Sequence, residues 1–351
     1  MVDELVLPDY GGACIANIVP ALLGPPDETP AWMPAGVADA SQVVLFVVDG
    51  LGWEQLQARL RLAPTLASMT GGSVTTVAPS TTSTALTSLT TGLPPGEHGV
   101  VGYRIAAQGE VLNVLRWSTV AGDARQTIPP SKLQPSAPFL GERPAVVTRA
   151  EYRRSGFTGA HLDPARFWGY RTMATMVTEV GRLVRAGEPF VYAYYDGLDK
   201  VAHEYGLGEH YDAELAWIDH TVERLLTELR PGTALLVTAD HGQVEVGGNV
   251  IPLAAEVLAE CHMQSGEGGS AGSTPGRAGP GRCGTRPAPA TATTPGSAPA
   301  TRSCRSDGSG RSSRRRRSPG WGTWRWRPAP TSRSTTRWTP ARTSWWAGTG
   351  P

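Results

Sequence analysis

Three short apolar segments, each followed by an acidic residue near a glycine, constrain the fold of this chain more than any other feature. They are Ser41–Val48 before Asp49, Phe190–Tyr195 before Asp196, and Thr233–Thr238, which ends at Ala239-Asp240-His241-Gly242. Continuous apolar runs of about 4–8 residues are typical of strands that are covered on both faces of a parallel sheet. In open α/β sheets, ligand sites gather at the carboxyl ends of the strands. The pattern therefore predicts an α/β fold with a site just beyond these strands.

Helical segments alternate with these strands. Asp212–Leu229 repeats apolar residues at spacings of three and four, and Thr172–Val184 shows a similar periodicity. A further helix is predicted from Thr82 to Thr91, because Gly92 and the prolines beyond it are typical of a helix end. The irregular, proline-containing stretch 102–168 is interpreted as an insertion or cap over the strand ends.

Composition divides the chain near Cys261 into a predicted catalytic domain, residues 1–261, and a tail, residues 262–351. The tail holds 15 Arg and six of the 11 Trp, with no Leu, Ile, Val, Phe or Tyr. Its amino acids are those with GC-rich codons, as in a GC-rich gene translated out of frame. We therefore interpret the tail as disordered and aberrant, the product of a frameshift, in preference to a natural basic arm that binds nucleic acid.

Several protein classes are not expected from the sequence. The longest purely apolar run, Val43–Val48, is far shorter than the roughly 20 residues that cross a bilayer. The first basic residue is Arg59, so the start of the chain lacks the positive region of a signal peptide, and a cytoplasmic location is expected. The four cysteines do not suggest a disulfide framework.

Acids and histidines at the predicted strand ends form a metal-binding pattern. They are Asp49, the pair Asp199 and His203, and the adjacent Asp240 and His241. Carboxylates with imidazoles suit Zn²⁺ or Mn²⁺. Each residue alone also has a structural explanation: Asp49 could cap the next helix, and Asp199 with His203 could be a solvated helix face.

A cluster of hydroxyls, Ser80–Thr84, begins the predicted helix 82–91. The N-terminus of a helix attracts anions such as phosphate, and a hydroxyl that touches a metal there can act as a nucleophile. Ordinary helix capping is the alternative interpretation of these hydroxyls.

These segments together resemble the nucleotide pyrophosphatase/phosphodiesterase branch of the alkaline phosphatase superfamily. The resemblance is carried, in the family's order, by VVLFVVDGLG (Val43–Gly52), APSTTSTALTSLTTGLPPGEHGVVGY (Ala78–Tyr103), DGLDKVAHEYG (Asp196–Gly206) and LLVTADHGQ (Leu235–Gln243). It implies a three-layer αβα sandwich around a mostly parallel sheet. It also implies a metal-dependent phosphoric ester hydrolase that acts on a small phosphate ester, with nucleotides among the candidates.

The resemblance assigns roles to individual residues. Two metal ions, usually zinc, are implied, and Asp49, Asp240 and His241 match the ligands of one. Thr82 matches the nucleophile at that same ion, with Thr81 as the second choice. Asp199 and His203 match two ligands of the other ion, and Asp196 is a weaker candidate. Tyr103 stands where many relatives place an asparagine that contacts the phosphate.

One implied ligand is missing, because the family takes a third histidine from a C-terminal His-Gly block and this chain has no histidine after His262. The frameshift would explain the loss: Thr343–Pro351, back-translated with GC-rich codons and read two bases later, gives Glu-Leu-Val-Gly-Arg-His-Gly-Pro. Three alternatives stay open. They are a phosphomonoesterase or phosphotransferase of the same fold, a catalytically impaired frameshifted product, and a protein that binds nucleic acid through its arginines, including Arg314–Arg317.

Overall fold

The computed structural model describes residues 6–25, 29–248, 250–267, 270–275 and 342–349. Within them the main sheet has seven strands. In spatial order they are β2 (Thr70–Thr75), β13 (Arg342–Thr349), β10 (Thr233–Thr238), β1 (Gln42–Val48), β9 (Phe190–Tyr195), β7 (Ala145–Arg149) and β8 (Arg166–Tyr170). The strands from β10 to β8 run parallel, whereas β13 is antiparallel to both β10 and β2. The predicted α/β fold with a mostly parallel sheet is therefore confirmed.

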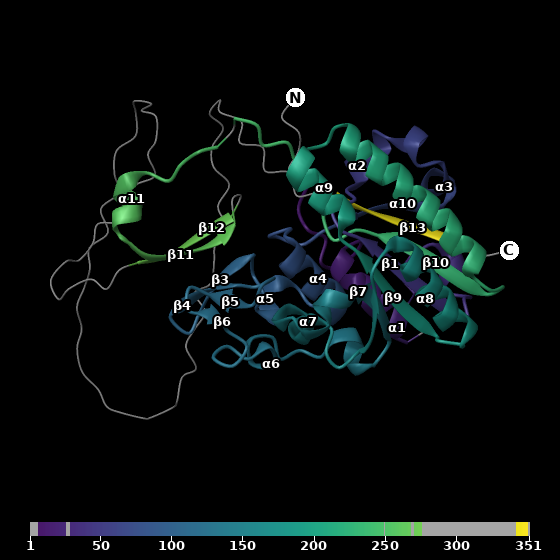
Figure 1. Cartoon of the computed structure of the whole chain (residues 1–351), viewed down its shortest axis with the longest axis horizontal. Coiled ribbons are helices and arrows are strands. Elements are labelled where there is room, and N and C mark those ends of the chain that lie inside the picture. The colour runs from purple at the N-terminus through teal and green to yellow at the C-terminus, as the bar shows by residue number, and fades with distance from the viewer. Residues whose placement is uncertain (1–5, 26–28, 249, 268–269, 276–341, 350–351) are drawn as a thin grey trace. The chain divides into compact units, whose positions relative to one another are not determined.

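Helices cover both faces of the main sheet, because successive strand residues point to opposite sides. On one face, Val44, Phe46 and Val48 of β1 pack with the apolar sides of α2 (Trp53–Gln57), α3 (Pro64–Ser68), α8 (Met173–Arg185), α9 (Gly197–Tyr205) and α10 (Glu209–Glu228). Figure 1 shows α10 beside α8 and α9 on this face. On the other face, Leu45 and Val47 pack against α1 (Ile18–Leu23), α4 (Thr82–Thr91) and α7 (Gly156–His161).

Helix α4 is stabilised by packing more than by helix propensity. Ser83 to Thr91 are all buried, although threonine and serine are modest helix formers. The hydroxyls of Thr87 and Thr91 donate to the carbonyls of Ser83 and Thr87, both at 2.6 Å, so these buried polar groups are satisfied. Gly92 ends the helix in the left-handed conformation (φ +74°), as the sequence predicts.

A smaller sheet lies outside the main one. Its strand order is β12 (Ser270–Pro275), β11 (Cys261–Glu267), β3 (Arg104–Ala107), β4 (Glu110–Asn113), β5 (Ser118–Thr119) and β6 (Gly122–Asp123). The remaining helices are short, namely η1 (Ile15–Asn17), η3 (Ala35–Val37), η4 (Leu60–Leu62), α5 (Pro95–His98), α6 (Pro130–Leu133), η5 (Pro138–Gly141), η6 (Ala150–Arg154) and α11 (Ala255–Ala259). No helix in the described part of the chain is both long and apolar enough to cross a membrane.

The interval 102–168, predicted as a cap, divides into two parts. Residues 104–123 form strands of the smaller sheet, but β7 and β8 extend the main sheet in parallel with β9. That this interval acts as a cap over the strand ends remains a prediction. The apolar run of β7 spans only Ala145 to Val147, and β8 is half exposed. The place of β7 in the main sheet therefore depends on pairing with β9, and that of β8 on pairing with β7.

The predicted boundary at Cys261 and the predicted disorder of the tail remain predictions. The described parts of the tail form β11, β12 and β13. The arginine cluster Arg314–Arg317 lies outside the described residues.

Candidate metal centre and active site

The topology of the sheet brings together the acidic residues that end three strands. Strands β10, β1 and β9 are adjacent and parallel, with Leu45 paired to Leu236 on one side and to Tyr192 on the other. Their carboxyl ends therefore meet at one edge of the sheet. Asp49, Asp196 and Asp240 all lie at this edge and are at most 4% exposed.

Three predicted ligands, Asp49, Asp240 and His241, form a buried cluster whose ligand atoms all lie within 4.8 Å of one another. His241 Nε2 lies 3.3 Å from Asp49 Oδ1 and 3.6 Å from Asp240 Oδ2. Thr82 Oγ1 lies 3.0 Å from the same nitrogen. The structure thus places the predicted nucleophile beside the three predicted ligands.

Each carboxylate of this cluster is anchored through one oxygen only. The hydroxyl of Tyr194 donates to Asp49 Oδ2, and the backbone N–H groups of Gly50 and His241 donate to Asp240 Oδ1 at 3.2 and 2.9 Å. The other two oxygens, Asp49 Oδ1 and Asp240 Oδ2, are buried and find no hydrogen-bond partner among the described residues. Buried oxygens without a donor are costly, so they indicate a missing positive partner.

His241 is oriented for the same partner. Its Nδ1 lies 3.0 Å from the carbonyl oxygen of Gly242, so Nδ1 carries the hydrogen and donates it. In the neutral ring, Nε2 then carries a lone pair that faces the carboxylates. Metal-binding histidines in proteins are fixed in this way, through a hydrogen bond from the ring nitrogen that does not bind the metal.

The electrostatics of the cluster agree with this geometry. Burial, with the negative charges of Asp240 and Asp199, raises the pKa of Asp49 well above its usual range. Burial is also the main reason that the pKa of Asp240 is raised. Burial alone would lower the pKa of His241, but the charges of Asp240 and Asp199 outweigh it and leave this pKa raised. The cluster therefore holds more negative charge than its surroundings neutralise.

A divalent cation fits these residues. Zinc bonds to carboxylate oxygen and imidazole nitrogen are about 2.0–2.1 Å long, so the ligands of a tetrahedral zinc lie about 3.3 Å apart. The separations of 3.0, 3.3 and 3.6 Å around His241 Nε2 match that spacing. The donor set of two carboxylates, one imidazole and one hydroxyl suits Zn²⁺ or Mn²⁺.

Thr82 is the first residue of α4 and is partly buried. The first intrahelical bond runs from the N–H of Ala85 to the carbonyl of Thr81, at 2.8 Å. The N–H groups of Thr82, Ser83 and Thr84 therefore have no acceptor within the helix. They lie at the positive end of the helix dipole, which suits a phosphate next to the Thr82 hydroxyl.

Asp199 and His203 lie one turn apart on α9, as predicted, but they form only a pair. His203 Nε2 is 3.4 Å from Asp199 Oδ1, and the His203 side chain is 73% exposed. The same carboxylate oxygen accepts a hydrogen bond of 2.6 Å from the side-chain amide of Gln243. Among the described residues no third donor joins this pair, so a second cation does not fit as well as the first.

The weaker candidates have other partners. Asp196 accepts hydrogen bonds from Arg149 and from the hydroxyl of Tyr152, and it lies 2.6 Å from the Lys200 ammonium. The Asp196 carboxylate is therefore occupied by ion pairs and a hydrogen bond within the protein. The hydroxyl of Tyr103 accepts a hydrogen bond of 2.6 Å from the side-chain amide of Asn113. Tyr103 is not one of the described residues that line the cavity beside Thr82.

Gly50 is required by the close approach of three segments. Its φ is +76°, and a Cβ atom there would lie 2.6 Å from Gln243 Nε2 and 3.1 Å from Asp199 Cβ. Only glycine allows this contact without a shift of its neighbours. The glycine turn after β1 thus brings Asp49 close to the loop that carries His241.

Sequence reasoning missed the residues that support the cluster, chiefly Tyr194 and Gln243. A signal for Tyr194 was present, because Tyr192 and Tyr194 lie two residues apart in the predicted strand Phe190–Tyr195 and so share one of its faces. A buried strand that keeps hydroxyls on one face indicates hydrogen-bond partners on that side. Gln243 carried no such signal, since its partner Asp199 is 44 residues away.

The fold and the site together define the class of protein. It is an α/β protein in which a cluster of potential metal ligands lies at the carboxyl edge of the sheet, beside a threonine at a helix N-terminus. Residues 43–282 match the family described as type I phosphodiesterase / nucleotide pyrophosphatase. The chain belongs to this family, whose members are hydrolytic enzymes, and the resemblance noted in the sequence is confirmed.

Two solved structures are similar to part of the chain. The chain is similar to murine ectonucleotide pyrophosphatase/phosphodiesterase 5, with 18% identity and a TM-score of 0.45 over 61% of this chain and 62% of that one. It is also similar to an inactive variant of that murine protein in complex with AMP, with 16% identity, a TM-score of 0.46 and 62% of each chain covered. The chain thus spans less than two thirds of these solved structures. No curated protein matches it.

Proposed function

We propose that this chain is a metal-dependent phosphoester hydrolase of the phosphodiesterase/nucleotide pyrophosphatase type. One observation carries the proposal. Asp49 Oδ1, Asp240 Oδ2 and Thr82 Oγ1 converge on His241 Nε2 at 3.0–3.6 Å, and the two carboxylate oxygens lack any other partner among the described residues.

Asp49, Asp240 and His241 would hold a divalent cation, with Zn²⁺ favoured over Mn²⁺ by the compact set of one nitrogen and two oxygens. When bound, such a cation stabilises a threonine alkoxide and polarises a phosphoryl oxygen. Tyr194 and the backbone N–H groups of Gly50 and His241 hold the carboxylates so that their free oxygens stay directed at one point.

Thr82 is the proposed nucleophile. Its oxygen attacks phosphorus in line with the leaving oxygen, and the bond from phosphorus to that oxygen breaks, which leaves a phosphorylated Thr82 and a free alcohol. The free N–H groups at the start of α4 lie where they can donate to phosphoryl oxygens and stabilise the charge of the transition state. Water then hydrolyses the phosphothreonine and restores the hydroxyl.

A second cation is expected in the family pattern, but Asp199 and His203 supply only two donors, and the chain has no histidine after His262. The proposed frameshift would account for the missing ligand. Sequencing the gene near the codon for Glu267 tests it, since a single intact frame with no nearby insertion or deletion contradicts it.

We propose phosphodiesters or nucleotide pyrophosphates as the substrate class, supported by the family's description as type I phosphodiesterase / nucleotide pyrophosphatase. A phosphomonoesterase of the same fold is the alternative. We expect the purified chain with added zinc to hydrolyse bis(4-nitrophenyl) phosphate faster than 4-nitrophenyl phosphate, and a chelator to abolish both activities. Faster cleavage of the monoester favours the alternative, and no zinc-dependent cleavage of either ester contradicts the proposal.

A further inference from the structure

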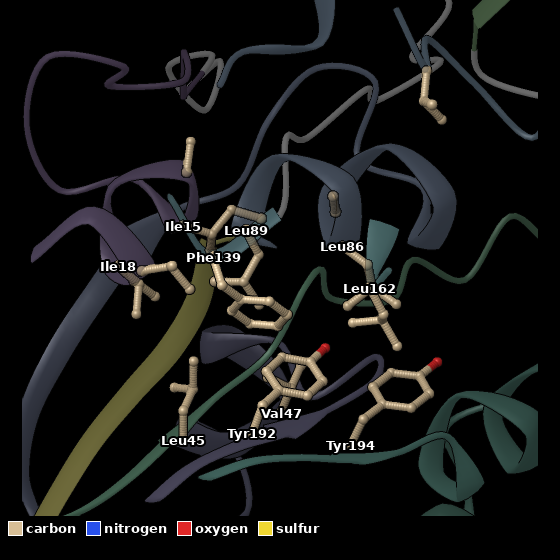
Figure 2. Packing of buried hydrophobic residues seen from close by; sticks show 14 of the residues in the cluster. Ile15, Ile18, Leu45, Val47, Leu86, Leu89, Phe139, Leu162, Tyr192 and Tyr194 are labelled. Carbon is tan, nitrogen blue, oxygen red and sulfur yellow. The ribbon is translucent and has the colours of Figure 1, made fainter. Parts of the chain in front are cut away.

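The segment that carries His241 lacks the support of regular secondary structure. The strands of the sheet are fixed by pairing and apolar packing, and Figure 2 shows Leu45 of β1 beside Tyr192 of β9, its partner in the ladder. Residues 241–246, just beyond β10, form neither helix nor strand. The position of this loop therefore depends on the partners of its individual backbone and side-chain groups.

The side chain of Gln55, in α2, binds both backbone groups of one residue in this loop. Gln55 Nε2 donates to the carbonyl oxygen of Gln243 at 3.0 Å, and Gln55 Oε1 accepts from the N–H of Gln243 at 3.3 Å. Two residues of an antiparallel ladder exchange N–H···O bonds in the same way. The amide of Gln55 thus takes the place of a neighbouring strand.

A glycine makes room for this pairing. A Cβ atom at Gly52 would lie 1.9 Å from Gln55 Oε1 and 2.7 Å from the Cα atom of Gly242. Both distances are too short for any side chain, so only glycine allows α2 to approach the loop this closely. The approach occurs at the residue that follows His241.

The pairing reaches the ring of His241 through a single peptide group. The carbonyl of Gly242 and the N–H of Gln243 belong to the same peptide group, which is planar. At one end of this group, the Gly242 oxygen accepts the hydrogen bond of 3.0 Å from His241 Nδ1. At the other end, the N–H of Gln243 donates to Gln55. The bond to Gln55 therefore sets the direction of the carbonyl that orients the imidazole.

The loop has two further contacts that do not involve Gln55. Gln243 Nε2 donates to Asp199 Oδ1 at 2.6 Å, and Glu245 Oε1 accepts from the N–H of Leu207 at 2.9 Å. Both contacts are made by side chains of the loop. Loss of the Gln55 amide should therefore leave the loop attached to its neighbours but free the peptide groups on either side of Gln243.

We propose that Gln55 is a positioning residue of the metal centre. It fixes the peptide group between Gly242 and Gln243, and so keeps His241 Nε2 directed at the carboxylates of the cluster. The inference rests on the proposed function, because it concerns the cation site assigned there. A loop without this bond adopts the binding orientation less often, and the apparent affinity for a cation falls by the same factor.

Competition of the full chain with a fluorescent zinc chelator tests the proposal. Gln55→Met keeps a side chain of similar length and helix propensity without the amide. It should weaken zinc binding about 3- to 30-fold, the range for one to two neutral hydrogen bonds. Gln57→Met is the matched control, because Gln57 is an exposed residue of the same helix, and it should change the affinity by less than about twofold. Equal zinc affinities of Gln55→Met and the unchanged protein overturn the proposal.

A purely structural role of Gln55 gives a different result. Gln55→Met then lowers the thermal midpoint of the metal-free chain and leaves zinc affinity unchanged well below that midpoint. A positioning role also predicts that saturating zinc restores the hydrolysis that the variant loses at limiting zinc, because bound zinc selects the same loop orientation. A loss that saturating zinc does not recover lies outside the cation site and overturns the proposal.

Hydrogen exchange in the metal-free full chain tests the pairing itself. The amide hydrogen of Gln243 is bound to Gln55, so it should exchange about 3- to 10-fold faster in Gln55→Met and at an unchanged rate in Gln57→Met. Equal rates in the three proteins overturn the proposal. If Gln55→Met does not fold, Gln55→Asn replaces it, because a side chain one carbon shorter cannot make both bonds, and the same changes are expected.

Failure of the proposed function is distinct from failure of this inference. Zinc binding without hydrolysis in the unchanged protein overturns the proposed function alone. Zinc binding and hydrolysis that are equal in the unchanged protein and in Gln55→Met overturn the role of Gln55 alone. Absence of zinc binding by the unchanged protein overturns both.

Discussion

The two halves of the candidate site contain similar residues in very different surroundings. Asp49, Asp240 and His241 follow buried strands and are less than 10% exposed. Asp199 and His203 lie on α9, and the His203 side chain is 73% exposed. Strand ends in a sheet are fixed on both sides by neighbouring strands, whereas a helix surface fixes its side chains through fewer contacts.

The difference also concerns hydrogen bonding. The first cluster leaves two buried carboxylate oxygens without a partner among the described residues, and the pKa values of Asp49 and Asp240 are raised. For Asp199, burial opposes ionisation, but hydrogen bonds from His203 and Gln243 and the nearby His241 outweigh it, so its pKa is lowered. A cation would therefore stabilise the first cluster, whereas the charge of Asp199 is already stabilised by His203 and Gln243. Four predictions test this contrast.

The largest expected effect concerns the nucleophile. Thr82→Ala should reduce zinc-dependent phosphoester hydrolysis on the order of 10⁴-fold or more, because no other group replaces the attacking oxygen. Zinc binding should largely persist, since Asp49, Asp240 and His241 are unchanged. Thr81→Ala is the matched control, because the Thr81 side chain makes no capping hydrogen bond to the helix. Equal losses in both variants would remove Thr82 from this role.

The second prediction compares the two halves as ligands. Asp240→Asn should weaken zinc binding by more than about 100-fold, because it removes a charged donor from a preformed site. His203→Asn should weaken it by less than about threefold. Competition with a fluorescent chelator measures both values. A similar large loss in the two variants would mean that Asp199 and His203 complete a real metal site.

The third prediction concerns the support of Asp49. Tyr194→Phe removes the hydroxyl that orients this carboxylate, and zinc affinity should fall about 10- to 100-fold, the usual effect of losing a group that orients a ligand. Tyr192→Phe is the matched control on the same strand, because its hydroxyl has no partner among the described residues, and it should leave zinc affinity unchanged. The same chelator competition decides, and equal effects of the two changes would contradict the anchoring role.

The sequence predicts most of what local pattern determines. The limits of β9, β10 and α4 match the predicted segments residue for residue, because apolar runs and the glycine stop are local signals. The meeting of Asp49, Asp240 and His241 was also predictable, since the carboxyl ends of neighbouring parallel strands share one edge. Helix α10 begins three residues earlier than predicted, at Glu209, where an acidic first turn favours the helix N-terminus.

What escaped prediction depends on contacts between distant segments. The places of β7 and β8 in the main sheet follow from pairing, and the ion pair of Asp196 with Arg149 joins residues 47 positions apart. The Tyr192 hydroxyl has no hydrogen-bond partner among the described residues, and no spacing in the sequence indicates this. The isolation of Asp199 and His203 was partly visible in the sequence, which has no histidine after His262.

The last prediction compares how Asp240 and Asp199 affect the free energy of unfolding of the metal-free protein. The raised pKa of Asp240 means that the folded chain keeps a proton that the unfolded chain loses, so the free energy of unfolding falls as pH rises above about 4. Asp199 has a lowered pKa, so its contribution to the free energy of unfolding is present above about pH 4 and is lost as pH falls further.

At pH 8, Asp240→Asn should therefore raise the free energy of unfolding by roughly 1–3 kcal/mol, because it removes a buried charge that no cation neutralises in the metal-free protein. Asp199→Asn should lower it by about 1–2 kcal/mol, because it weakens charged hydrogen bonds. Urea unfolding of the chelator-treated variants at pH 8 and pH 4 measures both changes, and both should shrink at the lower pH. A change of the same sign in the two variants at pH 8 would mean that the two halves do not differ in their need for a cation.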